Sequence, residues 1–434
     1  MLRLSLVIFL VLSPALQALP TASVKKSIQR LEKNEGAVEK LLLPYAFSTE
    51  SMGAVFGLGY MRRGLYQSQM TTAVTAFAGS ESSAFAFGIW DFKPLEQGRF
   101  FLSVISMLGD YPRNIAYAVP SNTPINVNQV RPGANNSSAD IFIERPGRSN
   151  FMDIKMEWML PMGAAKHDAI MPYRLKGGLL ESGASGGETW NPWLGGVSVA
   201  VIRNFNRYQS FESEQSFVDT NTHGLEIGLL YDNTDFPVNP SSGSRQYIAI
   251  AGENAWASSK KKWHAFTMES SHYFSLGRSS YARQRVLAFN AWAAYSPSWK
   301  YVQQADGSEI IEDAAPYNQA ATLGGFYRLR GFNNNRFHDK AAVYTTAEYR
   351  YTLEVNPAEG VDWLRFLKLD WLQLVPFVEA GRVAPNIQSE TLFTDWKYDV
   401  GLGIRGLFAG TVLRLDVVES EEGTALWAMV GHPF

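Results

Sequence analysis

The chain has 434 residues, of which 46% are hydrophobic, 13% aromatic and 18% charged, and its formal net charge is -2. The charged fraction is below the roughly 25% of an average soluble protein, and the near-neutral balance argues against a nucleic-acid-binding protein, which usually has an excess of basic residues. The absence of cysteine excludes disulfides, thiolate metal sites and a thiol nucleophile. Few charges, many aromatic residues and 36 glycines favour a β-rich protein that faces lipid.

The N-terminus has the features of a secretory signal peptide, which we place at residues 1–18. Arg3 supplies the positive charge, and the apolar run that follows is too short for the roughly 20 residues of a membrane anchor. Residues 19–46 combine spaced apolar residues with many charges, which predicts a short periplasmic tether, either helical or partly disordered. No later apolar run approaches the ~18 residues of a membrane helix, so only a closed β-barrel remains as a spanning structure.

From residue 47 onwards the hydrophobic pattern has a period of two. In the segment GLEIGLLYD, for example, Leu225, Ile227 and Leu229 alternate with Glu226 and Gly228. A soluble β-sandwich shows the same alternation, but many such segments behind a signal peptide, with so little charge, favour a transmembrane barrel. We therefore predict an all-β, antiparallel barrel in the bacterial outer membrane, spanning residues 47–434.

The alternating segments predict about 16 strands, an even number as expected of bacterial barrels. The predicted strands are 51–61, 68–80, 82–91, 99–110, 150–160, 172–182, 194–206, 222–232, 244–253, 262–275, 283–295, 342–353, 373–382, 396–407, 410–418 and 424–434. The assignment is weakest over 111–215. Two connections are unusually long, 111–149 and 296–341, and loops of this length tend to be functional or disordered.

Four features follow one another in the second half of the chain. They are the Asp-, Asn-, Pro- and Gly-rich turn within Tyr231–Ile250, the Arg-Gly-Phe of LGGFYRLRGFNNNRFHD, the strand FVEAGRV and the final ALWAMVGHPF. Over residues 223–434 this ordered set resembles the bacterial surface antigen superfamily, the 16-stranded barrels of the Bam and Tam assembly factors and the two-partner secretion transporters. Family members usually carry POTRA domains before the barrel, whereas 19–46 is too short for one, so the chain is similar to the subgroup without them.

Two acidic residues are expected to face the barrel lumen. In 342–353, Tyr344 and Glu348 share one face and Val343 and Ala347 the other, and the apolar face must meet lipid. Glu379 faces inward by a related argument. An unpaired carboxylate in a confined lumen is costly, and a guanidinium binds carboxylates in a bidentate fashion.

The resemblance implies a partner for these acids. In the family, the arginine of the Arg-Gly-aromatic motif folds into the lumen and pairs with acids on the inner wall. Carried over, this arginine is Arg330, followed by Gly331 and Phe332, and its partners are Glu348 and Glu379. The pair would fix the position of the loop.

Alternatives stay open for these residues. Arg330 could remain in solvent, and Arg328 or Arg336 could take its place. Phe434 is expected to serve recognition by the barrel-assembly machinery, or to be a lipid-facing residue of the last strand, and both interpretations can hold together. The front half of the Trp- and Leu-rich segment Val361–Phe377 predicts either an interfacial segment or a packed periplasmic connection.

We expect no enzyme, metal or cofactor. The six histidines show no metal-binding spacing, and no Gly-x-Ser-x-Gly motif occurs. The expected function is to assist insertion or transport of proteins or lipids at the outer membrane, with membrane lipid, the assembly machinery and a protein or lipid cargo as partners and no nucleic acid. A passive diffusion pore and a barrel enzyme acting on envelope lipid are the alternatives.

Overall fold

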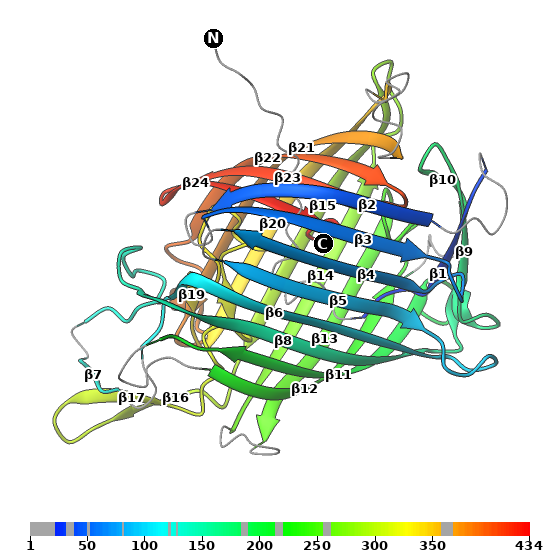
Figure 1. Cartoon of the computed structure of the whole chain (residues 1–434). Coiled ribbons are helices and arrows are strands. Elements are labelled where there is room, and N and C mark those ends of the chain that lie inside the picture. The colour runs from blue at the N-terminus through cyan, green and yellow to red at the C-terminus, as the bar shows by residue number, and fades with distance from the viewer. Residues whose placement is uncertain are drawn as a thin grey trace, which may run out of the picture.

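A computed structural model of the chain describes residues 22–31, 39–49, 53–79, 82–119, 123–126, 129–183, 190–212, 220–254, 262–356 and 368–434. Sixteen strands form one sheet in chain order, and each strand is antiparallel to its neighbours, which confirms the predicted barrel class (Figure 1). The strands are β2 (Glu39–Thr49), β3 (Gly53–Arg63), β4 (Thr71–Gly79), β5 (Ser83–Phe92), β6 (Phe100–Ala116), β8 (Ile143–Met159), β11 (Val197–Gln209), β12 (Thr220–Asp232), β13 (Gly243–Asn254), β14 (Lys262–Ser275), β15 (Ala282–Tyr295), β20 (Ala341–Leu353), β21 (Leu369–Ala384), β22 (Lys397–Phe408), β23 (Thr411–Ser420) and β24 (Gly423–Val430).

The alternation that predicted the strands also sets which side chains face the lumen. In β14, Trp263 and Ala265 are buried inside, whereas Phe266 and Met268 are exposed on the outer wall. In a membrane these outward residues contact acyl chains, and the inward positions can be polar. Among the described residues no helix is long and apolar enough to cross a membrane.

One barrel strand was not predicted and one predicted barrel strand is wrong, so the total of 16 is unchanged. β2 occupies residues 39–49 and so begins within the segment 19–46 that was assigned to the tether. The charged residues before it obscured the alternation of Leu41 and Leu43. The predicted barrel strand 172–182 instead forms two short strands outside the barrel sheet. Its alternation is real, but a strand of six residues is shorter than the 9–11 needed to cross a membrane.

The first and last strands of the sheet meet without completing the ladder. β2 and β24 are the two ends of the strand order, so the described residues do not continue the backbone pairing from one to the other. Instead, Arg63 of β3 donates from Nη1 to the Gly410 carbonyl at 2.9 Å, and Val430 packs against the apolar cluster that contains Leu41. Side-chain contacts of this kind therefore link the first strands of the sheet to the last ones.

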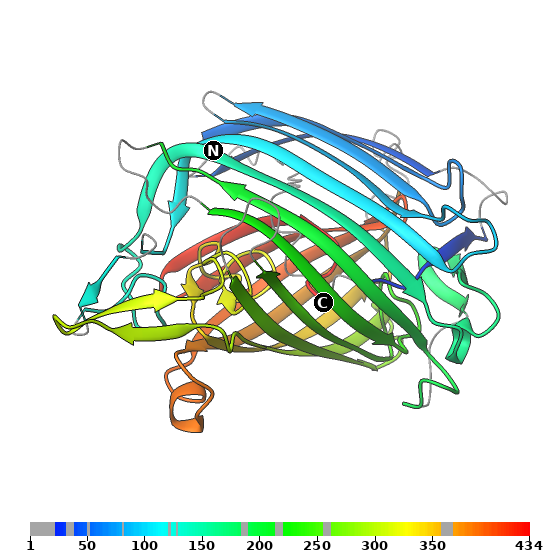
Figure 2. The ribbon, with the colours of Figure 1, turned by 90° about the horizontal axis from the view of Figure 1, so that it is seen from below.

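The smaller elements divide between the two ends of the barrel (Figures 1 and 2). The loop end carries β7 (Ile125–Asn126), β16 (Lys300–Gln303), β17 (Ser308–Glu312), β18 (Thr322–Leu323), β19 (Phe337–His338) and α1 (Ser389–Leu392). The turn end carries β1 (Lys26–Arg30), the 3-10 turn Gly163–Ala165, β9 (Met171–Lys176) and β10 (Leu179–Gly183). The long connection expected over 296–341 is present between β15 and β20. The signal peptide 1–18 and most of the front half of 361–377 lie outside the described residues.

Candidate functional site in the barrel lumen

The connection between β15 and β20 folds back into the barrel as a compact loop, residues 323–339, here called the arginine loop. Gly324 has φ +103, and a Cβ there would lie 2.3 Å from the Asn333 carbonyl oxygen, so only glycine fits this turn. Leu329 and Phe332 are buried in an apolar cluster with inner-wall residues such as Tyr344. The loop thus has its own packed core against the wall.

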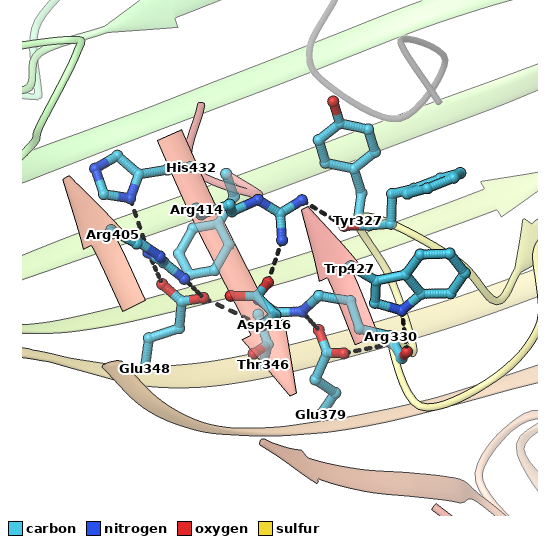
Figure 3. A network of polar contacts seen from close by, with 12 residues as sticks. Tyr327, Arg330, Thr346, Glu348, Glu379, Arg405, Arg414, Asp416, Trp427 and His432 are labelled. Atoms are coloured by element: carbon cyan, nitrogen blue, oxygen red, sulfur yellow. Dashed lines mark hydrogen bonds and ion pairs between the residues drawn. The ribbon is translucent and has the colours of Figure 1, made fainter. Parts of the chain in front are cut away.

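Arg330 is fully buried and contacts three acids from three different strands (Figure 3). Its Nη2 lies 3.1 Å from Glu348 of β20, its Nε 3.1 Å from Glu379 of β21, and its Nη1 2.7 Å from Asp416 of β23. The Arg330 backbone N–H also donates to Glu379 at 2.6 Å. The structure therefore brings together the three charged residues singled out from the sequence and adds a fourth, Asp416.

Aromatic residues enclose this arginine. The guanidinium carbon lies 3.5 Å from the ring centroid of Phe377, which is a close cation–π contact. The indole N–H of Trp427 donates to the Arg330 carbonyl. Burial alone lowers the pKa of Arg330, but Glu379, Asp416 and Glu348 outweigh it and hold the pKa well above its ordinary value. Arg330 is charged and its surroundings exclude water.

Gly331 allows the loop to approach the wall closely. A Cβ at this position would lie 2.7 Å from the Cβ atoms of both Asp399 and Ser420. In its absence the Gly331 N–H donates to Asp399 Oδ2 at 2.8 Å, and the Ser420 hydroxyl donates to the Gly331 carbonyl at 2.6 Å. Phe332, the third residue of the motif, packs edge-on against Phe337.

The sequence reasoning missed the remaining charges of the network. Arg350 and Arg405 both contact Glu348, with nitrogen–oxygen distances of 3.0 and 2.6 Å, and Arg414 pairs with Asp416. Each stands on an inward position of its strand. In TVLRLDVV, Arg414 and Asp416 alternate with leucines. This alternation predicts that both side chains face the lumen, but it does not predict their position along the barrel axis.

The other two loop arginines have different partners and do not replace Arg330. Arg328 lies 3.1 Å from Glu269 and stacks on Trp292. Arg336 pairs with Glu422 at 2.9 Å and donates to Ser137 in the connection between β6 and β8. These contacts fasten the arginine loop to the barrel wall at β14 and β15, to the turn between β23 and β24, and to the connection between β6 and β8.

Phe434 does not lie on the last strand. β24 ends at Val430, and the following residues turn into the lumen, where Phe434 is 5% exposed. Its ring stacks on Tyr273 with 6.2 Å between centroids, and the guanidinium of Arg350 lies 5.0 Å from its centroid. The lipid-facing interpretation is wrong, because the chain bends inward after Gly431 and the ring packs against β14 and β15.

A second insert lies at the turn end. It is formed by Ala22–Arg30 together with β9 and β10 and is here called the turn-end insert. β1 pairs in parallel with β9, and β10 pairs antiparallel with the other edge of β9. Val24 and Tyr173 pack against inner-wall residues such as Phe101 and Val199. The insert is therefore packed against the barrel wall.

Charged contacts attach the turn-end insert on opposite sides of the barrel mouth. The buried amine of Lys25 lies 2.7 Å from Asp91 of β5 and 2.6 Å from Glu157 of β8. Arg30 lies 2.6 Å from Asp370 of β21. The insert thus spans from β5 and β8 to β21.

Among the described ranges no group of three or more histidine, aspartate or glutamate side chains is arranged to hold a metal ion.

Comparisons with known proteins agree with this architecture. The Omp85 superfamily domain matches residues 195–417. A search of curated proteins finds no match. The solved structures include CdiB from Escherichia coli, with 9% identity, a TM-score of 0.51, and coverage of 92% of this chain and 61% of that one.

Two further structures are similar. BamA from Haemophilus ducreyi lacking POTRA domains 1-3 has 11% identity, a TM-score of 0.45, and coverage of 91% of this chain and 69% of that chain. CdiB from Acinetobacter baumannii has 9% identity, a TM-score of 0.45, and coverage of 91% and 59%. The chain thus spans about three fifths of the length of the two CdiB chains. Since the Omp85 domain matches more than half of the chain, the protein is a bacterial outer-membrane β-barrel that belongs to the Omp85 superfamily.

Proposed function

We propose that the protein assists the insertion or transport of proteins or lipids at the outer membrane, without acting as an enzyme. The observation that carries this proposal is that separate inserts occupy both ends of the lumen. The arginine loop is fixed through Arg330 at one end, and the turn-end insert is fixed through Lys25 at the other. The resemblance to assembly factors and secretion transporters supports the same role.

A passive diffusion pore has no need for such inserts. Buried, ion-paired segments across both mouths restrict steady passage, whereas a protein that handles cargo must open only at defined moments. Two routes are available to cargo, the lumen after the inserts move and the seam between β2 and β24, which no backbone ladder closes among the described residues. We further propose that residues 1–18 are a signal peptide and that Phe434 takes part in recognition by the barrel-assembly machinery.

Locking the arginine loop tests this proposal. The chain has no cysteine, so an engineered pair is free of competing thiols. Gly331→Cys is paired with Ser420→Cys. A Cβ at Gly331 would lie 2.7 Å from the Cβ atoms of both Ser420 and Asp399, about 1 Å nearer than the ~3.8 Å typical of disulfides. A small outward shift of the loop accommodates the bond.

The locked protein is compared in cells and in planar bilayers. A strain lacking the gene is complemented with wild type, the cysteine pair, or each single cysteine, and its outer-membrane proteins and lipids are profiled together. We expect a changed profile in the deletion strain and restoration by wild type and by Ser420→Cys. The pair should restore the profile only when it is reduced, and Gly331→Cys alone measures how far the added Cβ itself disturbs the loop. Full restoration by the oxidised pair would contradict a function of the moving loop.

The alternatives give different results in the same experiments. A passive pore would conduct steadily in bilayers with and without the locked loop. A barrel enzyme would lose turnover of envelope lipid on a single polar substitution in the lumen, with folding unchanged. Conductance that is low and intermittent in wild type, and lower still in the oxidised pair, supports the proposal.

A further inference from the structure

The outer wall carries an apolar groove near the loop end, with a volume of about 600 Å³. Figure 2 shows α1 projecting outside the wall at this end. Leu392 of α1 packs against Ala341 and Ala384, and Ile387 just before α1 also lines the groove. The groove therefore lies between the connection from β21 to β22 and the lipid-facing wall.

The groove runs across the strands. Ile227, Ile250, Phe266, Tyr295 and Ala341 line it and are successive register partners on β12, β13, β14, β15 and β20. Four inter-strand steps give a length of roughly 19 Å, since neighbouring strands are about 4.8 Å apart. The row is long enough for most of an extended acyl chain.

Small side chains create the depression. Ala293 on β15 and Ala341 on β20 line the groove, while Ile250 on β13 and Phe266 on β14 are large and about half exposed. Because this wall faces the membrane, the medium that fills the groove is lipid rather than water.

Two cations stand at the end of the groove nearest the loops. The Lys340 amine lies 5.9 Å from the ring centroid of Tyr295, and among the described residues no ion pair of this amine with a carboxylate is found. Arg382 is the register partner of the groove residue Val343. Its carboxylate partner Asp395, at 3.3 Å, is 86% exposed, and its buried Nε has no hydrogen-bond partner in the structure.

We propose that this groove is a binding site for an anionic lipid of the leaflet at the loop end. Its acyl chain lies along the row from Ala341 towards Ile227, and its phosphate meets Lys340 and Arg382. Basic residues beside a membrane attract anionic headgroups, and the enclosed chain adds apolar contact that the open wall does not provide. The site is independent of how the lumen functions.

Native mass spectrometry of the purified full chain tests the site, with phosphatidylglycerol and phosphatidylcholine of identical chains as probes. We expect wild type to retain phosphatidylglycerol preferentially during delipidation. Ala293→Phe fills the groove and should lose most of the retained lipid, whereas Ala291→Phe, on the same strand outside the groove, should not. Lys340→Gln should lower the preference for the anionic lipid about fivefold.

Each result has a defined meaning. Equal retention by Ala293→Phe and Ala291→Phe, or no headgroup preference in wild type, overturns the proposal. A change in the number of chains per particle in place of lipid loss would assign the groove to a contact between copies and also overturns it. Heat-dependent migration checks that each variant is folded, and Ala293→Leu, with a smaller side chain, replaces Ala293→Phe if the latter does not fold.

Discussion

Arg330 and Asp416 are 86 residues apart in the chain, yet Arg330 Nη1 lies 2.7 Å from Asp416 Oδ2 in the lumen. The same guanidinium reaches Glu348 and Glu379, so one loop side chain connects β20, β21 and β23. A buried ion pair is weak support for net stability, because desolvation offsets the attraction. Its clearer effect is to fix one position of the loop, since any other position leaves buried carboxylates without their cation.

Removing the charge of Arg330 should release the loop. Arg330→Met keeps an unbranched apolar stem but removes the guanidinium, which leaves Glu379 without its arginine, and breaking such a pair costs about 3–5 kcal/mol. We expect the variant to unfold at a lower temperature, as measured by heat-dependent migration, and to be cleaved faster by proteases within 296–340. Arg278→Met is the matched control, since its pair with Glu354 is exposed and is worth at most about 1 kcal/mol. Equal behaviour of the two variants would contradict the anchoring role.

Removing the charge of Lys25 should release the turn-end insert from the barrel wall. Lys25→Met leaves Asp91 and Glu157 without the buried amine, although Lys155 still lies 3.1 Å from Glu157. A loss of about 3 kcal/mol corresponds to a rise of about a hundredfold in the displaced population. We therefore expect more frequent openings in planar bilayers, while Lys176→Met, an exposed change on β9, should behave as wild type. Unchanged openings in Lys25→Met would show that the insert does not limit conduction.

Much of the barrel could be predicted from the sequence because alternation directly encodes which face of a strand meets lipid. The inward facing of Glu348 and Glu379 follows from that rule, and the structure places both beside Arg330. Asp416 and Arg405 were not predicted as partners, because the alternation does not show how far along the barrel axis a side chain lies. Height depends on the shear between strands, which only the full set of pairings determines.

The two misassigned segments failed for different reasons. β2 follows a charged stretch, and its Pro44 interrupts the apolar pattern, so local composition favoured a tether. β9 alternates as cleanly as a barrel strand, with Met171, Tyr173 and Leu175 buried. Its partner, however, is β1, and the paired residues Lys26 and Met171 are 145 positions apart in the chain. Such long-range parallel pairing has no local signal in a sequence.

A substitution at Phe434 can distinguish its packing inside the lumen from the proposed recognition by the barrel-assembly machinery. Phe434→Ala removes a ring that is buried against Tyr273, and such truncations typically cost about 3–5 kcal/mol. We expect barrel refolded in detergent to unfold at lower temperature, because refolding in detergent bypasses the assembly machinery. Loss of insertion in cells with unchanged stability in detergent would instead leave recognition as the role of Phe434 and contradict the packing contribution.

Acidification should loosen the loop end through His338. Arg131 Nη1 donates to His338 Nδ1 at 3.0 Å, and Arg131 also pairs with Asp339 at 3.2 Å. Burial and the neighbouring Arg131 charge hold the pKa of His338 well below 6.5. The released loop binds a proton near pH 6.5 while the docked loop does not, so the stabilisation is complete above pH 6.5 and is lost as the pH falls below it.

At pH 5.5 the loss is about 1.4 kcal/mol, or a tenfold rise in the released loop, relative to pH 7.5. Cleavage within 296–340 by a protease that is calibrated on an unfolded substrate at each pH measures this population. His338→Asn keeps an acceptor for Arg131 but does not titrate, so its cleavage should change little with pH. An equal pH response in wild type and His338→Asn would assign the effect to another group, because only His338 differs between them.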